Sequence, residues 1–252
     1  MKCLLVVALA GLASIALTQT WSDGKGLTAK YQEFKMDRRP NNDYDLFLAK
    51  NVSVSSNPQG LKLLSDTMQI HAVPDVKNPK SYLVQHAVAV GKVFVTKTVR
   101  SKTGAETTQI DGTKADYTSG VNESLVKMDG PMQIQSLDEQ KHPTMTATSK
   151  VGVATLEPLT KSNIDNGLKK ATLDGDVKLV LTQTDLKSNK LTTIRTFSDH
   201  MILENLPTGK RVTLTGSVRI IGDEVGDIAG AKSAVFTIAK NGDFHLETSR
   251  MQ

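Results

Sequence analysis

Five short segments of the chain share one alternation of apolar and polar residues. They start 41, 39, 45 and 41 positions apart, at Lys50, Gly91, Gly130, Gly175 and Gly216. Residues two and four positions before and after each start are apolar in all twenty cases, whereas random placement at 38% apolar residues would give about eight. A spacing of two puts these side chains on one face of an extended strand. The pattern therefore predicts a repeat of half-buried antiparallel strands.

The apolar residues of this repeat are expected to line one common interior surface. From the second repeat onward the strongest candidates are Val93, Val95, Val126, Met128, Met132, Ile134, Leu173, Val177, Leu179, Val212, Leu214, Val218 and Ile220. The central glycine falls on the same face, so we predict that it points inward. Glycine inside a strand marks a bend, a bulge or a close backbone approach. Because it recurs at one place in four repeats, the sheet is expected to fold over along a common line.

The segments between the repeats predict return strands and turns. Return strands are expected at residues 61–73, 113–119, 144–156, 192–203 and 231–239. Turn signals are the pairs Asp111-Gly112, Asn166-Gly167, Thr208-Gly209 and Asn241-Gly242. Residues 28–35 are compatible with one helical turn, and residues 36–44 resemble a loop. The fold class is therefore all-β, with repeated antiparallel strands.

The first residues differ in character from the rest. Lys2 is followed by apolar or small residues from 3 to 17, a stretch too short to cross a bilayer comfortably. This predicts a secretory signal peptide over residues 1–20 and a periplasmic location. Its removal would take away Cys3, the chain's one cysteine, so no disulfide or thiolate chemistry is expected. Beyond it we distinguish an N-terminal extension (21–44), a first repeat group (45–157), a polar hinge or loop (158–169) and a second repeat group (170–252).

Several repeat units resemble a known family. Leu-Asp-Gly-Asp-Val-Lys-Leu (173–179), Val-Thr-Leu-Thr-Gly-Ser-Val-Arg-Ile (212–220) and residues 228–236 are similar to the organic-solvent-tolerance-like (OstA-like) repeat of periplasmic lipopolysaccharide-transport proteins. The resemblance implies a folded-over β-jellyroll, or β-taco, whose apolar slot holds acyl chains of lipopolysaccharide. All twenty repeated apolar positions, including the thirteen strongest candidates, match the slot-lining positions of that family. It also implies end-to-end joining through edge strands, to further copies or to other envelope lipid-transport proteins. We expect those edges near residues 46–54 and 235–246.

Charge and motifs favour no other chemistry. The net charge is +5, but the basic residues are scattered among acidic ones and lack interleaved aromatic residues, which disfavours nucleic-acid binding. None of the five histidines has a metal-ligand spacing, and no nucleophile elbow or phosphate loop occurs. We therefore predict no catalytic residue, no metal and no cofactor.

The sequence thus predicts passive binding and transfer of an amphipathic lipid such as lipopolysaccharide. Two alternatives stay open. One is a structural envelope protein whose interior is a dry β-sandwich core without a ligand. The other is a carbohydrate-acting enzyme on a β scaffold, which would need clustered carboxylates in a surface cleft.

Overall fold

The computed structural model describes residues 18–22, 27–56, 60–75, 78–101, 104–120, 122–156, 168–185, 190–223, 225–239 and 244–250. All helix or strand structure in these ranges is β-strand, which confirms the all-β prediction. The strands are β1 Gln19–Ser22, β2 Leu27–Tyr31, β3 Glu33–Arg38, β4 Tyr44–Ser56, β5 Leu61–Asp75, β6 Asn78–Ser101, β7 Gly104–Thr118, β8 Ser124–Leu137, β9 Pro143–Leu156, β10 Leu168–Asp185, β11 Lys190–Leu206, β12 Gly209–Gly222, β13 Gly226–Ala239 and β14 Phe244–Arg250.

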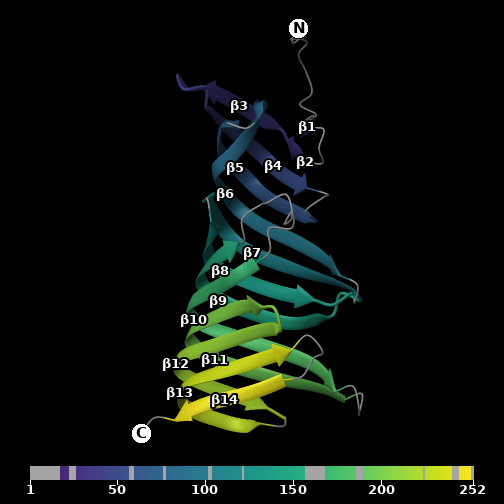
Figure 1. The fold of residues 1–252 in the computed structure, drawn as a ribbon, viewed down its shortest axis with the longest axis vertical. Coiled ribbons are helices and arrows are strands. Elements are labelled where there is room, and N and C mark those ends of the chain that lie inside the picture. Colours follow the sequence, from purple (N-terminus) through teal and green to yellow (C-terminus); the bar gives the residue numbers. More distant parts are fainter. Residues whose placement is uncertain are drawn as a thin grey trace.

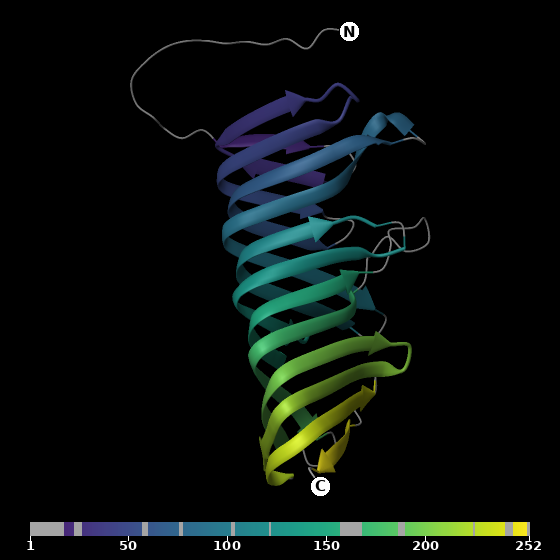
Figure 2. The same cartoon turned by 90° about the vertical axis from the view of Figure 1, so that its left-hand side faces the viewer.

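These strands form one antiparallel sheet in which nearly every strand pairs with its neighbours in sequence. The order runs from β1 and β2 through β4 to β14, and β3 pairs beside β2 on the same edge of β4. Figures 1 and 2 show the strands stacked across the long axis, with β1 to β3 at one end and β12 to β14 at the other. The sheet is therefore a linear stack in which each unit contacts the next, as in other repeat architectures.

Each long strand bends at the position of the repeated glycine. The pairing register shifts there in every repeat, between Ala49 and Val52 in β4, and likewise at residues 90–93, 129–132, 174–177 and 215–218. The neighbouring return strands shift beside them, for example at residues 64–67 and 111–114. A bulge adds a residue to one strand and bends it. Bulges aligned along the stack fold the sheet along one line, as the sequence predicts.

This bend line divides the sheet into two walls. The first wall comprises residues 44–49, 67–75, 78–90, 114–118, 124–129, 151–156, 168–174, 200–206, 209–215 and 233–239. The second wall comprises residues 52–56, 61–64, 93–101, 104–111, 132–137, 143–149, 177–185, 190–198, 218–222 and 226–231. The gap between the two walls at the far side from the bend line is called the mouth.

The prediction that the glycine points inward is wrong for three repeats. A Cβ atom on Gly91 or Gly216 would lie 2.1 or 2.3 Å from a carboxylate oxygen of Asp66 or Asp199, which are exposed residues of the neighbouring strands. A Cβ on Gly175 would meet the exposed Lys150 at 2.9 Å. All three glycines have φ between +71° and +104°. At a bulge the alternation is interrupted, so these glycines make room for an outer side chain crossing the bend.

The first repeat makes the same bend without glycine. Lys50 and Asn51 both adopt positive φ, 62° and 58°, a conformation that costs a lysine more than an asparagine. The Lys50 ammonium lies 2.5 Å from a carboxylate oxygen of Glu33 on β3. The bend is therefore a property of the stack, which imposes it where the local residues do not favour it.

Most return strands fall where the sequence predicts them, and several local expectations are wrong. Residues 28–35 form parts of β2 and β3, with no helical turn, and β3 continues to Arg38 inside the expected loop. Asp111 and Gly112 lie inside β7 at its bulge, whereas Leu206 and Gly209 pair across the expected turn at Thr208-Gly209. The other two turn signals, residues 1–17 of the expected signal peptide and residues 158–167 of the expected hinge lie outside the described residues. The last two residues of that expected hinge, 168 and 169, begin β10.

The described residues contain no helix long and apolar enough to cross a membrane. On either side of residues 157–167, β9 and β10 pair directly, from Leu168 with Leu156 to Leu181 with Met145. The sheet is thus continuous between the two groups of repeats.

Candidate functional site

The inner face of the folded sheet is the candidate site. All thirteen predicted lining residues belong to one hydrophobic cluster or pack against it. Eleven of them are buried, with exposed fractions of at most 6%, and two, Val95 and Val126, are half-buried. The structure therefore brings the predicted residues together on one interior surface.

Burial along this surface changes from one end of the stack to the other. In β10 to β12 the inner residues next to the bend line and one step further are covered on both walls: Val212, Leu214, Val218 and Ile220 are all 0% exposed. On β13 the equivalent Phe236 is 0% exposed, whereas Ile228 is half-buried. In β4 to β8 the residues next to the bend line are buried, for example Val93 at 2%. One step further toward the mouth, however, the inner side chains of these strands are half-buried, with the exception of Ile134 on β8, which is 6% exposed. The half-buried set comprises Leu46, Val54, Leu63, Ile70, Ala87, Val95, Ile110 and Val126.

We call β4 to β8 the open end of the interior and β10 to β13 its closed end. At the closed end the two walls meet in a dry core. At the open end they are packed along the bend line and partly exposed above it. Half-exposed aliphatic side chains on a concave face offer apolar surface that a bound ligand or partner can bury.

An ion pair shows directly that the two walls face each other. Lys210 of β12 lies in the first wall and Glu106 of β7 in the second, and Lys210 Nζ contacts a carboxylate oxygen of Glu106. Along a flat sheet, five strand spacings would separate them by about 24 Å, far more than the two side chains can span. Both residues are in phase with inner-face residues of their strands, Val212 and Ile110. The contact therefore crosses the mouth.

Small polar residues that were not predicted from the sequence lie on the inner face at the bend. Ser65, Ser149 and Ser198 are buried at 4–6% exposure where their return strands turn. Ser149 Oγ donates to the Val151 carbonyl at 3.1 Å and Ser198 Oγ to the His200 carbonyl at 3.0 Å, so these two hydroxyls bind their own bulges. The buried Ser65 Oγ has no hydrogen-bond partner among the described residues. The sequence contains a pattern that could have indicated them, because a serine followed by Asp or Lys stands at the equivalent position of three return strands.

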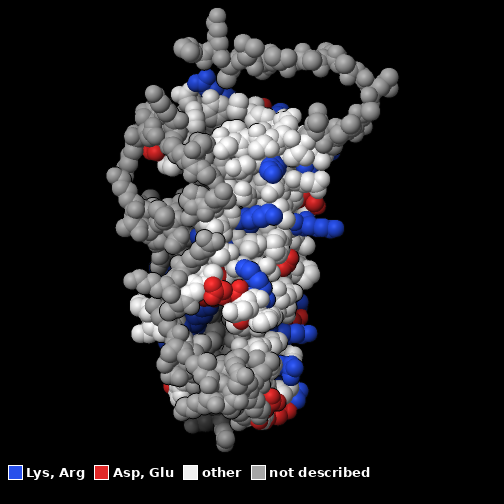
Figure 3. All heavy atoms as spheres, turned by 90° about the vertical axis from the view of Figure 1, so that its right-hand side faces the viewer, with Lys and Arg blue, Asp and Glu red and all other residues white. Residues whose placement is uncertain are grey.

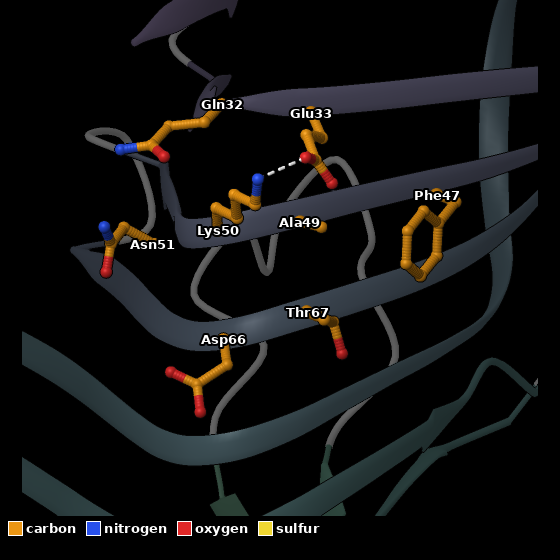
Figure 4. A pocket seen from close by; sticks show the side chains of 8 residues that line it. All are labelled: Gln32, Glu33, Phe47, Ala49, Lys50, Asn51, Asp66 and Thr67. Atoms are coloured by element: carbon orange, nitrogen blue, oxygen red, sulfur yellow. Dashed lines mark ion pairs between the residues drawn. The ribbon is translucent and has the colours of Figure 1, made fainter. Parts of the chain in front are cut away.

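Two hollows lie on the surface around β4 and β5. One, of about 630 Å³, lies beside the bend of β4 and β5 and is drawn in Figure 4, where the Lys50 ammonium points toward Glu33. The other, of about 600 Å³, lies across the first wall of β4 to β6 and includes His71 and His86. Neither is lined by any of the thirteen predicted residues. The first hollow is therefore separate from the candidate site, and the second borders it at Leu46 and Ile70.

A row of histidines and carboxylates crosses the outer face at the second hollow. His71 Nδ1 lies 2.8 Å from Asp45 Oδ1, and His86 Nε2 lies 2.8 Å from Asp116 Oδ1. The hydrogen bond from His71, followed by that from Arg39, lowers the pKa of the Asp45 carboxyl below its usual value. These pairs tie neighbouring strands of the open end together. Within the described residues, no group of three or more His, Cys, Asp or Glu side chains is placed to hold a metal ion.

Charged residues of both signs are distributed over the visible described surface. Figure 3 shows blue and red side chains along the length of one face, with no single-sign field over the whole of it. Several of them are paired across the bend: the Lys150 ammonium lies 2.6 Å from Asp176 and lowers the pKa of that carboxyl. Ion pairs of this kind neutralise part of the charge on the described outer surface.

Comparisons with known proteins add no assignment. No family model matches the chain, and neither the curated proteins nor the solved structures gave a match.

Proposed function

We propose that the protein binds the acyl chains of an amphipathic lipid at its open end and passes that lipid on, in the manner of the OstA-like proteins that its repeats resemble. The observation that supports this proposal is the ring of half-buried aliphatic side chains on β4 to β8, next to a core that is fully dry at the other end. A flexible acyl chain needs apolar surface and no directed polar groups, which is what this lining offers.

The energy of such binding is sufficient. Burial of a methylene group is worth about 0.8 kcal/mol, so a twelve-carbon chain contributes on the order of 10 kcal/mol before the costs of association. In this proposal the protein acts by passive binding without a catalytic step, in the periplasm, and an energised partner supplies direction. Lipopolysaccharide or a similar envelope lipid is the ligand that the resemblance favours.

The closed end also supports the alternative of a structural envelope protein with a dry core. Among the residues that the structure describes, seven inner side chains are 0% exposed. If the open end in solution is as closed as β10 to β13, the protein has no room for a ligand. The two functions differ in one measurable property, saturable binding of an acyl chain.

The test is organic extraction of the purified full-length chain followed by mass spectrometry, together with titration of a fluorescent fatty acid. We expect acyl lipid to be extracted and the probe to bind saturably. Val95→Gln should weaken probe binding about tenfold, because an amide in an apolar site costs roughly 1–3 kcal/mol. Val90→Gln is the matched control on the same strand, since Val90 is 44% exposed on the outer face. No extracted lipid and no saturation would favour the structural alternative.

The edges of the sheet are proposed as contact sites for further copies or for other envelope lipid-transport proteins. The prediction that β4 is an edge is wrong, because β5 pairs with one side of it and β2 and β3 with the other. The N-terminal edge consists of β1 and β3, and at the other end β14 pairs with residues 231–238 of β13. On β3, Phe34 and Met36 are exposed at 45% and 53%. Unpaired strand edges of this kind can accept another strand.

Native mass spectrometry over a range of concentrations tests this contact. We expect oligomers that grow with concentration, since end-to-end addition does not close a ring. Phe34→Asp should shift the distribution toward monomer, whereas Phe47→Asp on the outer face of β4 should not. A chain that stays monomeric at high concentration would exclude self-assembly through these edges.

A further inference from the structure

The ion pair between Glu106 and Lys210 lies at the mouth, and the proposed function assigns no role to it. It joins β7, a strand of the open end, to β12, a strand of the closed end, across the mouth. Glu106 lies four residues beyond Ile110, one of the half-buried lining residues, in the direction of the mouth. A ligand that enters between the walls at β7 must therefore pass this pair.

The backbone beside Glu106 is held in place. The neighbouring Thr107 is only 2% exposed, its Oγ1 accepts a hydrogen bond from Lys141 Nζ at 2.8 Å, and it lies 3.1 Å from Thr98 Oγ1. Three segments, β6, β7 and the turn before β9, thus meet at this point of the second wall. An anchored carboxylate costs less entropy to pair than a free one.

The partner side is also ordered. Lys210 follows the turn that ends in the pairing of Leu206 with Gly209, and its side chain is 29% exposed, compared with 47% for Glu106. A lysine with a largely covered stem and a charged end at the surface can hold its ammonium at a fixed place. The two walls therefore present opposite charges to each other from ordered positions.

We propose that Glu106 and Lys210 form a clasp that holds the two walls together at the mouth and limits the admission of an acyl chain to the open end. The clasp closes when the interior is unoccupied and opens when a ligand separates the walls. This inference rests on the proposed function for the identity of the ligand. The closing of the mouth itself does not depend on it.

The first experiment tests the contact in the full-length chain without a ligand. A carbodiimide forms an amide bond between a carboxylate and an amine only when the two groups are in contact. Peptide mass spectrometry should therefore find Glu106 cross-linked to Lys210. High salt should lower the yield, because screening weakens a partly exposed pair. Hydrogen exchange of β4 to β8 should become faster in Glu106→Gln. Absence of the cross-link, or exchange unchanged from the native chain, would overturn the clasp.

The second experiment measures how fast the fluorescent fatty acid enters. Glu106→Gln and Lys210→Gln should each raise the association rate about two- to fivefold, the range that corresponds to an exposed ion pair. The double variant Glu106→Lys with Lys210→Glu should return to the native rate. Arg219→Gln is the control, because Arg219 pairs with Asp227 of the adjacent strand on the outside of the sheet.

The outcomes separate the two proposals. If the native chain binds no probe, the proposed function fails, whether or not the cross-link forms. If the probe binds but the single variants match the native rate, or the double variant does not restore it, the clasp fails and the proposed function stands.

Discussion

Leu214→Ala is expected to lower the free energy of unfolding by about 3–5 kcal/mol, whereas Leu63→Ala is expected to cost about 1 kcal/mol. Both leucines lie on the inner face, Leu214 on the first wall of β12 and Leu63 on the second wall of β5. Leu214 is 0% exposed, so its truncation leaves a cavity that the surrounding strands cannot fill. Leu63 is half-buried, and water already reaches part of its side chain.

Urea unfolding measured together with hydrogen exchange tests this difference. In a linear stack the two ends can unfold separately, so exchange rates should report β11 to β13 for Leu214→Ala and β4 to β6 for Leu63→Ala. Leu206→Ala, at a residue 41% exposed, serves as the surface control and should cost little. Equal and large losses at Leu214 and Leu63 would mean that both ends have the same dry core, which would remove the physical basis for a ligand at the open end.

The repeat in the sequence was sufficient to predict the all-β fold, because its two spacings specify two different features of the sheet. The apolar residues two and four positions from the bend fix which face is inside, and the interval of about 41 residues between starts fixes how many strands each unit contains. Val218 and Ile220 occupy two of these repeated positions, and both are buried. The residues next to them in the sequence, taken alone, would not distinguish their strand from one at the surface.

The side on which the glycines face could not be predicted from alternation. Alternation holds only while the strand is regular, and at the bulge two residues oppose one. Gly175 therefore lies under Lys150, a residue 25 positions earlier, which is a contact that only the pairing register specifies. The same reason explains why Asp111-Gly112 looked like a turn, since residues that permit a turn also permit a bulge.

The sequence predicted which residues line the candidate site. It did not predict how deeply each of them is buried. The pattern assigns Val95 and Leu179 to equivalent positions, yet one is half-buried and the other is 0% exposed. Their difference depends on the distance between the two walls, which depends on the twist accumulated over many strands. Glu106 and Lys210 were missed for the same reason, because 104 residues separate them and no local pattern brings them together.

Gly216→Ala is the second change for which we expect a large effect, a loss of about 3 kcal/mol or more of the free energy of unfolding. Two separate costs add at this position. The φ of +71° is unfavourable for any residue with a Cβ, by roughly 1–2 kcal/mol. In addition, the new Cβ would lie 2.3 Å from Asp199 Oδ2 and 2.9 Å from Asp199 Cβ, so that the bend of β11 against β12 has to shift.

Gly230→Ala isolates the first cost. Gly230 has nearly the same φ, +72°, but a Cβ there would meet no atom within 4 Å, so only the backbone strain of roughly 1–2 kcal/mol is expected. Thermal and urea unfolding of the two variants should therefore differ by the cost of the close approach. Asp199→Gly in the Gly216→Ala background should recover that part, because it removes every side-chain atom in the way. If Gly216→Ala is no more destabilising than Gly230→Ala, the strands can separate at the bend line at little cost, and the line is a flexible hinge instead of the fixed fold that holds the two walls at their present angle.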